Sequence, residues 1–309
     1  MLETKYRTMS DGHEIFVRTY TPESEPIGSF YILHGMGEHG DRYDSFAKLL
    51  CKEGFKVYTH DHRGHGKTVE RNGILGHFAD EKGFDRVVQD VYEIVQQTEQ
   101  QDGYLRPRII FGHSMGSFIA RRFIQIHSSI IDACILCGTG TTTTLHKVGN
   151  LLANYLAAKE GKQIESKFMN DMTFTSFNKQ FDNVKTPFDW LSTNEKEVEK
   201  YQEDPLCGFI PTHQFFADLT EGLLTIHKKE ENAKIRRDLP VLLISGSDDP
   251  VGNNGAGVYK VANQLKNAGL AHVVVYLFEQ MRHEILNEKN NEHVYDVIIR
   301  WLRHEQSKH

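Results

Sequence analysis

The amino-acid sequence predicts an α/β protein built on a mostly parallel, doubly wound β-sheet with one helical insertion. Two patterns predict this class. Short apolar, β-rich runs recur along the chain, and an amphipathic helical stretch follows most of them. That order is typical of parallel strands joined by right-handed helical crossovers, which place helices on both faces of the sheet. The alternation stops between residues 141 and 238, where helical patterns continue without a convincing buried strand.

Each element of the sheet region follows from its residue pattern. The helix expected over residues 84–101 is the clearest, since Val87, Val88, Val91 and Val95 fall close to one helical face. The expected strands span residues 14–20, 29–33, 55–59, 108–111, 133–137, 241–245 and 272–278. The expected helices of this region span residues 44–53, 84–101, 115–127, 256–268 and 288–305.

The stretch without strands is too long to be a loop of a compact sheet. It contains helical patterns at residues 148–158 and 215–227, and strand character returns just after Asp238. We therefore expect a core formed by residues 1–140 and 239–309, and a helical cap formed by residues 141–238 over the carboxyl edge of the sheet. A chain of 309 residues is long enough for both parts.

Composition excludes several classes of protein. A formal net charge of −6 argues against nucleic acid or an anionic membrane surface as the main partner. No segment approaches the roughly 20 apolar residues of a membrane-spanning helix. Residues 1–18 are polar and charged, unlike a signal peptide. Four cysteines do not make a disulfide framework in a chain of this size. A cytoplasmic protein with reduced thiols is expected.

A candidate nucleophile lies in the pentapeptide Gly112-His113-Ser114-Met115-Gly116, between a strand pattern and a helix pattern. A G-x-S-x-G run in this position predicts a strained turn that presents the serine hydroxyl. Glycine is expected at both ends because a side chain there would collide with neighbouring backbone. A serine hydroxyl is a poor nucleophile by itself, so Ser114 needs a base, an acid and oxyanion donors.

The base and acid are sought on loops at the carboxyl ends of strands, where a doubly wound sheet carries its site. Of 17 histidines, His283 lies just after the last strand pattern and before the final helix. The strand ending near Gly246 leads into Asp248 and Asp249, and either carboxylate is a candidate acid. Asp249 is favoured because the following Pro250 biases it toward extended backbone. The order Ser114, Asp249, His283 is that of α/β-hydrolases.

Two backbone N–H groups are candidate oxyanion donors. Met115 follows the nucleophile and supplies the first donor. An apolar strand leads into His34 and Gly35, and Met36 at the following turn supplies the second. His34 and Gly35 are expected to shape that loop without taking part in the reaction.

Several other polar groups have both a possible chemical role and a possible structural role. His60, His62 and His65 with Asp61 are one candidate metal cluster, but alternate residues on a glycine turn favour bracing of the loop. Cys134 and Cys137 lie within one apolar strand, where such positions point to opposite faces, so they are expected to be core thiols. Glu38 and Arg42 are expected to form a local salt bridge that steadies the oxyanion loop.

Four motifs stand in a fixed order along nearly the whole chain: His34-Gly-Met-Gly-Glu-His-Gly-Asp-Arg-Tyr43, Asp61-His-Arg-Gly-His-Gly66, the Ser114 pentapeptide and Gly246-Ser-Asp-Asp-Pro-Val-Gly252. Together they resemble the monoacylglycerol lipase/lysophospholipase branch of the α/β-hydrolases. Part of the expected cap is also similar to bacterial lysophospholipase-like members, namely the segment Phe188-Asp-Trp-Leu-Ser192, followed by Tyr201 and Asp204-Pro-Leu-Cys-Gly208.

The resemblance implies a serine esterase that releases a fatty acid from a glycerol-linked monoester. Carried onto this chain, it assigns Ser114 as nucleophile, Asp249 as acid and His283 as base, with the N–H groups of Met36 and Met115 as oxyanion donors. The family often has a short residue at the position of Met36, so this side chain is expected to narrow the acyl entrance.

The expected reaction is hydrolysis of single-chain lipid esters, monoacylglycerols or lysophospholipids, without metal or organic cofactor. Alternatives on the same fold are amide or carbon–carbon bond hydrolysis, acyl transfer to an alcohol, and a ligand sensor without catalysis. Contact with membranes is expected to be at most transient and to run through the cap. Apolar cap residues either pack against the sheet or line the acyl pocket, and they are Leu151, Leu152, Tyr155, Phe215, Phe216, Leu223 and Leu224.

Overall fold

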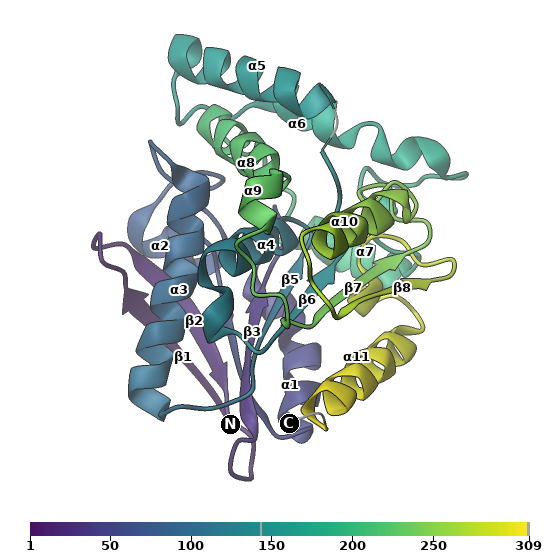
Figure 1. Cartoon of the computed structure of the whole chain (residues 1–309). Coiled ribbons are helices and arrows are strands. Elements are labelled where there is room, and N and C mark those ends of the chain that lie inside the picture. The colour runs from purple at the N-terminus through teal and green to yellow at the C-terminus, as the bar shows by residue number, and fades with distance from the viewer. Residues whose placement is uncertain (143, 308–309) are drawn as a thin grey trace.

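A computed structural model describes residues 1–142 and 144–307 (Figure 1). One eight-stranded sheet runs through the molecule in the order β1-β2-β4-β3-β5-β6-β7-β8. The pairs β1–β2 and β2–β4 are antiparallel, and the other pairs are parallel. The strands are β1 (Leu2–Thr8), β2 (Glu14–Tyr20), β3 (Gly28–Leu33), β4 (Phe55–His60), β5 (Arg108–His113), β6 (Ala133–Cys137), β7 (Val241–Gly246) and β8 (Val273–Phe278).

Helices cover both faces of the sheet, which confirms the predicted α/β class. Side chains of α1 and α11 pack in one apolar cluster with Phe30 and Ile32 of β3. Side chains of α3, α4 and α10 pack in another with Tyr31 and Leu33, so alternate residues of one strand serve opposite faces. The helices of this region are α1 (Asp44–Lys52), α2 (Val69–Asn72), α3 (Gly83–Asp102), α4 (Met115–His127), α10 (Ala256–Asn267) and α11 (Asn291–Gln306).

The segment between β6 and β7 is helical, and in its described residues the only strand-like pairing is an isolated bridge from Glu165 to Thr212. Its α-helices are α5 (Thr144–Glu160), α6 (Lys167–Phe174), α7 (Glu195–Glu203), α8 (His213–Ile226) and α9 (Lys229–Asn232). Among the described residues, the short 3₁₀ helices are Gly40–Tyr43, Gly66–Thr68, Ser128–Ile130, Phe177–Gln180, Asp189–Leu191 and Ile285–Asn287.

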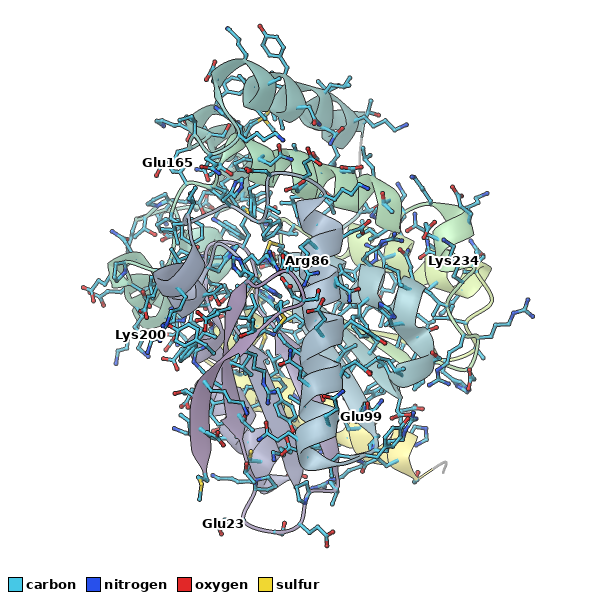
Figure 2. The ribbon with its side chains drawn as sticks, turned by 90° about the vertical axis from the view of Figure 1, so that its left-hand side faces the viewer. Glu23, Arg86, Glu99, Glu165, Lys200 and Lys234 are labelled. Carbon is cyan, nitrogen blue, oxygen red and sulfur yellow. The ribbon has the colours of Figure 1, made fainter. Side chains whose placement is uncertain are left out.

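The inserted segment gathers α5, α6 and α8 at one end of the molecule (Figure 1). Figure 2 shows Glu165 near that end, whereas Glu23, in the loop between β2 and β3, lies at the opposite end. Helix α8 packs on the sheet region, since Phe215 and Phe216 are buried in the same cluster as α3 and α4. The division into a core of residues 1–140 and 239–309 and a cap of residues 141–238 stays a prediction.

The predicted strands and helices of the sheet region are confirmed, with ends that shift by at most three residues. Strand β1 was not predicted. It is an edge strand whose polar residues Glu3 and Thr4 are exposed and whose Lys5 is half-buried, so it lacks the continuous apolar run of its neighbours. Within the described part of the chain, no helix has both the length and the apolar character needed to cross a bilayer.

Candidate active site

Ser114 occupies the turn between β5 and α4 with φ 52° and ψ −119°. A residue other than glycine rarely adopts this conformation, and holding it costs about 1–3 kcal/mol. The flanking glycines permit it: a Cβ at Gly112 would lie 2.2 Å from the Gly116 carbonyl oxygen, and one at Gly116 would lie 2.2 Å from the Leu33 carbonyl oxygen. The strained turn and the need for both glycines are therefore confirmed.

Hydrogen bonds hold this turn in place. The Ser114 N–H donates to the Cys137 carbonyl at 2.9 Å, which ties the turn to the end of the neighbouring strand β6. The Ser117 hydroxyl donates to the Ser114 carbonyl at 2.6 Å. The turn is thus fixed by backbone groups that the central sheet already holds, so its side chain direction is determined before any substrate arrives.

Asp249 and His283 meet at the carboxyl ends of β7 and β8. His283 Nδ1 lies 2.9 Å from Asp249 Oδ1, and the two residues are only 1% and 0% exposed. Asp249 also accepts hydrogen bonds from the Ser245 hydroxyl and the Val251 N–H, each at 2.9 Å. Asp248 accepts from the Ser247 hydroxyl instead. The structure therefore brings Asp249 to His283 as the sequence predicts.

A glycine at the end of β7 makes this meeting of loops possible. A Cβ at Gly246 would lie 2.1 Å from the Met281 carbonyl oxygen and 2.2 Å from that of Arg282. Because only glycine fits there, the loop that carries His283 packs directly on the strand end that leads to Asp249. This role of Gly246 depends on a partner 35 or more residues away, so the motif in which Gly246 lies does not by itself reveal it.

The ring of His283 lies beside the nucleophile turn. It packs against the ring of His113, the residue before Ser114, with ring centroids 4.7 Å apart. Gly138, with φ 59°, leaves room for it, since a Cβ there would lie 3.0 Å from His283 Cε1. Trp190 of the inserted segment contacts the same ring at 5.1 Å and accepts a hydrogen bond from the His283 N–H through its carbonyl. His113, Gly138 and Trp190 were not predicted as parts of the site.

The electrostatics of the pair suit a general base. Burial by itself would lower the pKa of His283, but the charge and hydrogen bond of Asp249 outweigh it and raise that pKa above 6.5. Burial would raise the pKa of Asp249, yet His283, Ser245 and the Val251 N–H hold it below its ordinary value. Burial and the charge of His283 lower the pKa of His113 to about 4, so that ring packs in its neutral form.

The loop after β3 lies directly against Ser114. A Cβ at Gly35 would be 3.2 Å from Ser114 Cβ, which places the neighbouring Met36 at the nucleophile turn. Met115 is the first residue of α4 and is buried, whereas Met36 is partly buried against the core. Both candidate oxyanion donors therefore belong to backbone that adjoins Ser114.

A buried ion-pair network steadies this loop. Glu38 accepts hydrogen bonds from the Gly35 N–H at 2.5 Å and the Tyr43 hydroxyl at 2.7 Å. Arg42 contacts Glu38 at 2.7 Å, which confirms the predicted salt bridge. The same guanidinium also binds Glu284 with two hydrogen bonds of 2.6 and 2.7 Å. Since Glu284 follows His283, Arg42 joins the oxyanion loop to the loop of the candidate base.

The histidines at 60, 62 and 65 are hydrogen-bonded within the protein. His60 Nε2 lies 3.0 Å from His62 Nδ1, and the His62 N–H donates to His34 Nε2 at 2.9 Å. Burial lowers the pKa of His60 and of His65 to about 4. Asp61 pairs with Arg18 at 2.6 Å. These neutral, bonded rings fit the bracing interpretation.

The two cysteines of β6 are core residues, as predicted. Cys134 packs in the cluster with α3 and α4, and Cys137 packs in the cluster with α1 and α11, on the opposite face. Both thiols are free and buried, and so neither serves as a redox pair with the other.

The cap residues do not share one surface. Leu151 and Tyr155 of α5 are 73% and 57% exposed. Phe215, Phe216 and Leu223 of α8 are buried in the core cluster, and Leu152 packs partly against it. Leu224 is half-buried. The lining of an acyl pocket by this set stays a prediction, but the structure separates its exposed members from its buried ones.

The sheet, its crossover helices and the loops around Ser114 define a serine ester hydrolase of the α/β-hydrolase fold. The chain belongs to the Hydrolase_4 family, described as serine aminopeptidase, S33, whose profile matches residues 24–290.

Its relatives carry mainly lipase names. Monoglyceride lipase of Rattus norvegicus is 29% identical over 240 residues, which cover 78% of this chain and 71% of the relative. Monoacylglycerol lipase of Mycolicibacterium smegmatis is 25% identical over 302 residues, covering 94% and 93%. A thermostable carboxyl esterase from Bacillus coagulans, solved in complex with glycerol, superposes with a TM-score of 0.91 at 28% identity and covers 98% of both chains. These findings confirm the resemblance to monoacylglycerol lipases.

Proposed function

We propose that Ser114 is the nucleophile, His283 the general base and Asp249 the acid that orients it. The observation that carries this proposal is the buried Asp249–His283 contact beside a serine held at positive φ. His283 takes the Ser114 proton as the hydroxyl attacks the ester carbonyl, and returns it to the leaving alcohol. The same ring then activates water, which releases the acid from the acyl-serine.

The oxyanion of each tetrahedral intermediate is proposed to bind the backbone N–H groups of Met36 and Met115. The close approach of Gly35 to Ser114 supports this assignment. One such donor contributes about 10²–10³-fold to the rate in a serine hydrolase. Side chains and backbone of this chain therefore supply each proton transfer and the charge stabilisation, and we propose a reaction without metal or organic cofactor.

The proposed substrate is a single-chain lipid ester, a monoacylglycerol or a lysophospholipid. The monoglyceride lipase names of the relatives support the glycerol ester. Exposed apolar side chains on the outer helices support a lipid substrate, and they are Leu145, Val148, Leu151 and Tyr155 of α5 with Phe168 and Met172 of α6. We propose that this face makes transient contact with the lipid aggregate from which substrate is drawn, and that the protein is cytoplasmic and does not bind nucleic acid.

A second candidate function is hydrolysis of an N-terminal amide, because the family description names an aminopeptidase. An aminopeptidase needs an anionic group for the substrate ammonium. Two buried carboxylates on the loops of the site, Glu38 and Glu284, are both bound to Arg42, and a third, Asp249, is bound to His283. That arrangement favours the ester over the peptide.

Labelling with a fluorophosphonate probe tests the nucleophile. The wild-type chain is expected to take one label, and Ser114→Ala is expected to take none and to lose activity by about 10⁵-fold or more. Ser45→Ala, at an exposed serine, is the control that is expected to keep both the label and the activity. Label on a folded Ser114→Ala chain would contradict the assignment.

Substrate class is tested separately on a panel of soluble acetyl esters, long-chain monoacylglycerols, lysophospholipids and aminoacyl amides. Mass spectrometry of the released acids and head groups identifies the product. Faster turnover of monoacylglycerols or lysophospholipids than of acetyl esters is expected. Preference for the amides would establish the peptidase in its place.

A further inference from the structure

Three side chains of different donor type meet beside the oxyanion loop. A ring nitrogen of His39, a carboxylate oxygen of Asp204 and the Cys207 sulfur all lie within 4.8 Å of one another. His39 Nε2 is 2.9 Å from Asp204 Oδ2. The sequence alone does not reveal this group, because His39 and Asp204 are 165 residues apart.

The backbone around the three residues is well fixed. The Gly208 N–H donates to the Gly37 carbonyl at 2.9 Å, and the Tyr201 hydroxyl donates to the same oxygen at 2.8 Å. The Cys207 N–H donates to the Asp204 carbonyl at 3.0 Å. Two chain segments are therefore already joined at this point, so the three donors are brought together before any ligand binds.

Burial points to an unused binding capacity at this place. His39 and Cys207 are only 6% and 9% exposed. Among the described residues, His39 Nδ1 is buried without a hydrogen-bond partner. Asp204 Oδ1 accepts the Leu206 N–H at 2.8 Å, which leaves Oδ2 directed at His39. Other buried histidines among the described residues, such as His62 and His65, also have one unpaired ring nitrogen, so it is the meeting of three donor types, and not the unpaired Nδ1, that points to a ligand.

A cavity of about 320 Å³ gives solvent access to His39 and Asp204, which are among its lining residues, whereas Cys207 lies behind them and does not line it. It lies on the side of the molecule where Lys200 is labelled in Figure 2. Its lining carries four carboxylates and two cations, Asp41, Asp44, Glu197 and Asp204 with Arg42 and Lys200, and each carboxylate is paired with a basic side chain. Both cations are engaged, Arg42 with Glu38 and Glu284 and Lys200 with Glu197.

We propose that His39, Asp204 and Cys207 bind a divalent transition-metal ion, Zn²⁺ in the first instance. Imidazole nitrogen, carboxylate oxygen and thiolate sulfur are all Zn²⁺ ligands, with bonds of about 2.0–2.3 Å. Three protein ligands leave a fourth position for water from the cavity. A thiolate ligand disfavours Ca²⁺ and Mg²⁺, which take oxygen ligands.

Binding requires two small changes. Tetrahedral bonds of those lengths place ligand atoms about 3.3–3.8 Å apart, so the widest separation must close by roughly an ångström. The Asp204 side chain is 32% exposed, and the movement requires its Oδ2 to exchange the contact with His39 for the metal ion. Burial raises the pKa of the Cys207 thiol, and the ion must therefore displace its proton.

A metal at this position would join the loop that carries Met36 to the segment after α7. This consequence for catalysis rests on the proposed function, whereas the binding itself does not. Binding is therefore tested by a spectroscopic readout that is independent of turnover, and inactivity of the enzyme would not count against it.

Titration of the chelator-treated protein with Co²⁺ tests the site. One equivalent is expected to bind with a thiolate-to-cobalt charge-transfer absorption, and Zn²⁺ is expected to displace it. Other histidines of the 17 in this chain can bind Co²⁺ without that absorption, so the thiolate band is the decisive signal. Absence of the band at millimolar Co²⁺ would overturn the proposal.

Variants locate the ligands. Cys207→Ser is expected to abolish the band, and Asp204→Asn to weaken Co²⁺ affinity by at least about tenfold. Cys51→Ser, at the half-buried thiol of α1, is the matched control that keeps the band unchanged. Survival of the band in Cys207→Ser, or unchanged affinity in Asp204→Asn, would refute the ligand set. The Asn variant keeps the shape of the side chain, so the test remains decisive even where the serine variant folds poorly.

Discussion

The loops around Ser114 and the outer face of the inserted segment are organised in opposite ways. In the loops, Asp249 and His283 are almost completely buried, and Asp249 accepts three hydrogen bonds. On the outer face, Leu151 and Tyr155 are 73% and 57% exposed. The difference teaches that the proposed catalytic groups are held by close packing, whereas the face proposed to contact substrate is a surface that can change without loss of the fold.

The inserted segment is itself divided. Helix α8 packs so closely on α3 that a Cβ at Gly222 would lie 2.3 Å from the Phe84 ring. Helix α5 packs on α8 and presents its other side to solvent. In energetic terms α8 therefore belongs with the sheet, and only the outer helices have the freedom expected of a substrate-selecting surface.

The largest expected effect comes from breaking the Asp249–His283 contact. Asp249→Asn is expected to lower kcat for a soluble ester by about 10⁴-fold, because the imidazole loses the anion that orients it. The pKa of His283 is raised in the wild type, so its activity should fall on the acid side as pH drops through a value above 6.5. In the variant His283 is still buried but has lost the Asp249 charge that raises its pKa. The pH at which activity falls on the acid side should therefore be lower than in the wild type. The kcat/KM profile from about pH 5 to pH 9 measures both effects.

Asp248→Asn is the control for this change, since Asp248 bonds to Ser247 and not to His283. Its activity and its pH profile should match those of the wild type. A large loss in Asp248→Asn together with a small one in Asp249→Asn would reverse the assignment of the acid.

Replacing a glycine by alanine should lower the free energy of unfolding at the Ser114 turn and raise it in the outer helix α5. Gly116→Ala places a Cβ 2.2 Å from the Leu33 carbonyl oxygen, where only backbone can give way, and should lower the free energy of unfolding by about 3 kcal/mol. Gly149→Ala in α5 meets nothing closer than 3.8 Å and should raise it by about 0.5–1 kcal/mol. Urea unfolding of both variants gives the two values. Equal losses at the two positions would contradict the contrast between the regions.

The same contrast explains what the sequence could predict. Strands covered on both faces form continuous apolar runs, and β5 to β7 were readable for that reason, whereas the exposed edge strand β1 was not. Ser114 could be predicted as the candidate nucleophile because its two glycines lie within the same pentapeptide. Asp249 and His283 could be predicted as the candidate acid and base because each follows a strand pattern. Trp190 reaches His283 from a distant helix turn, and no local pattern gives that contact. The buried residues of α5 are the small Gly149, Ala153 and Ala157, whereas large apolar residues such as Leu151 and Tyr155 are exposed, so its buried side could not be chosen from sequence.

A buried carboxylate under α8 offers a smaller, pH-dependent test. Burial raises the pKa of Asp218 to about 6, although the hydrogen bond from Gln214 and the nearby Gly83 N–H act to lower it. The pKa of Asp218 in the folded protein lies above its value of about 3.8 in the unfolded chain. The stabilisation from this group is therefore fully present below pH 3.8 and is lost as pH rises through about 6. Asp218→Asn should remove this loss, so that the free energy of unfolding of the variant gains about 3 kcal/mol relative to that of the wild type between acid and neutral pH.

Chemical unfolding of the two proteins at several pH values measures this difference. Asp171→Asn, in the outer helix α6 with a side chain 52% exposed, should show no such pH-dependent gain. Parallel curves for Asp218→Asn and the wild type would mean that Asp218 remains charged in the folded protein.

The smallest expected effect concerns the outer face alone. Leu151→Ser with Tyr155→Ser removes two exposed apolar side chains of α5, so the free energy of unfolding should change by less than about 0.5 kcal/mol. Turnover of long-chain monoacylglycerol presented in vesicles should fall by about tenfold, because burial of each such side chain in lipid contributes on the order of 1 kcal/mol. Turnover of a soluble acetyl ester should not change, since Ser114 and His283 are untouched. Ile126→Ser, at a side chain of α4 that is 47% exposed, is the matched control and should alter neither rate. Equal losses on both substrates in the double variant would place α5 in the chemistry of the site, and the separation of the two regions would fail.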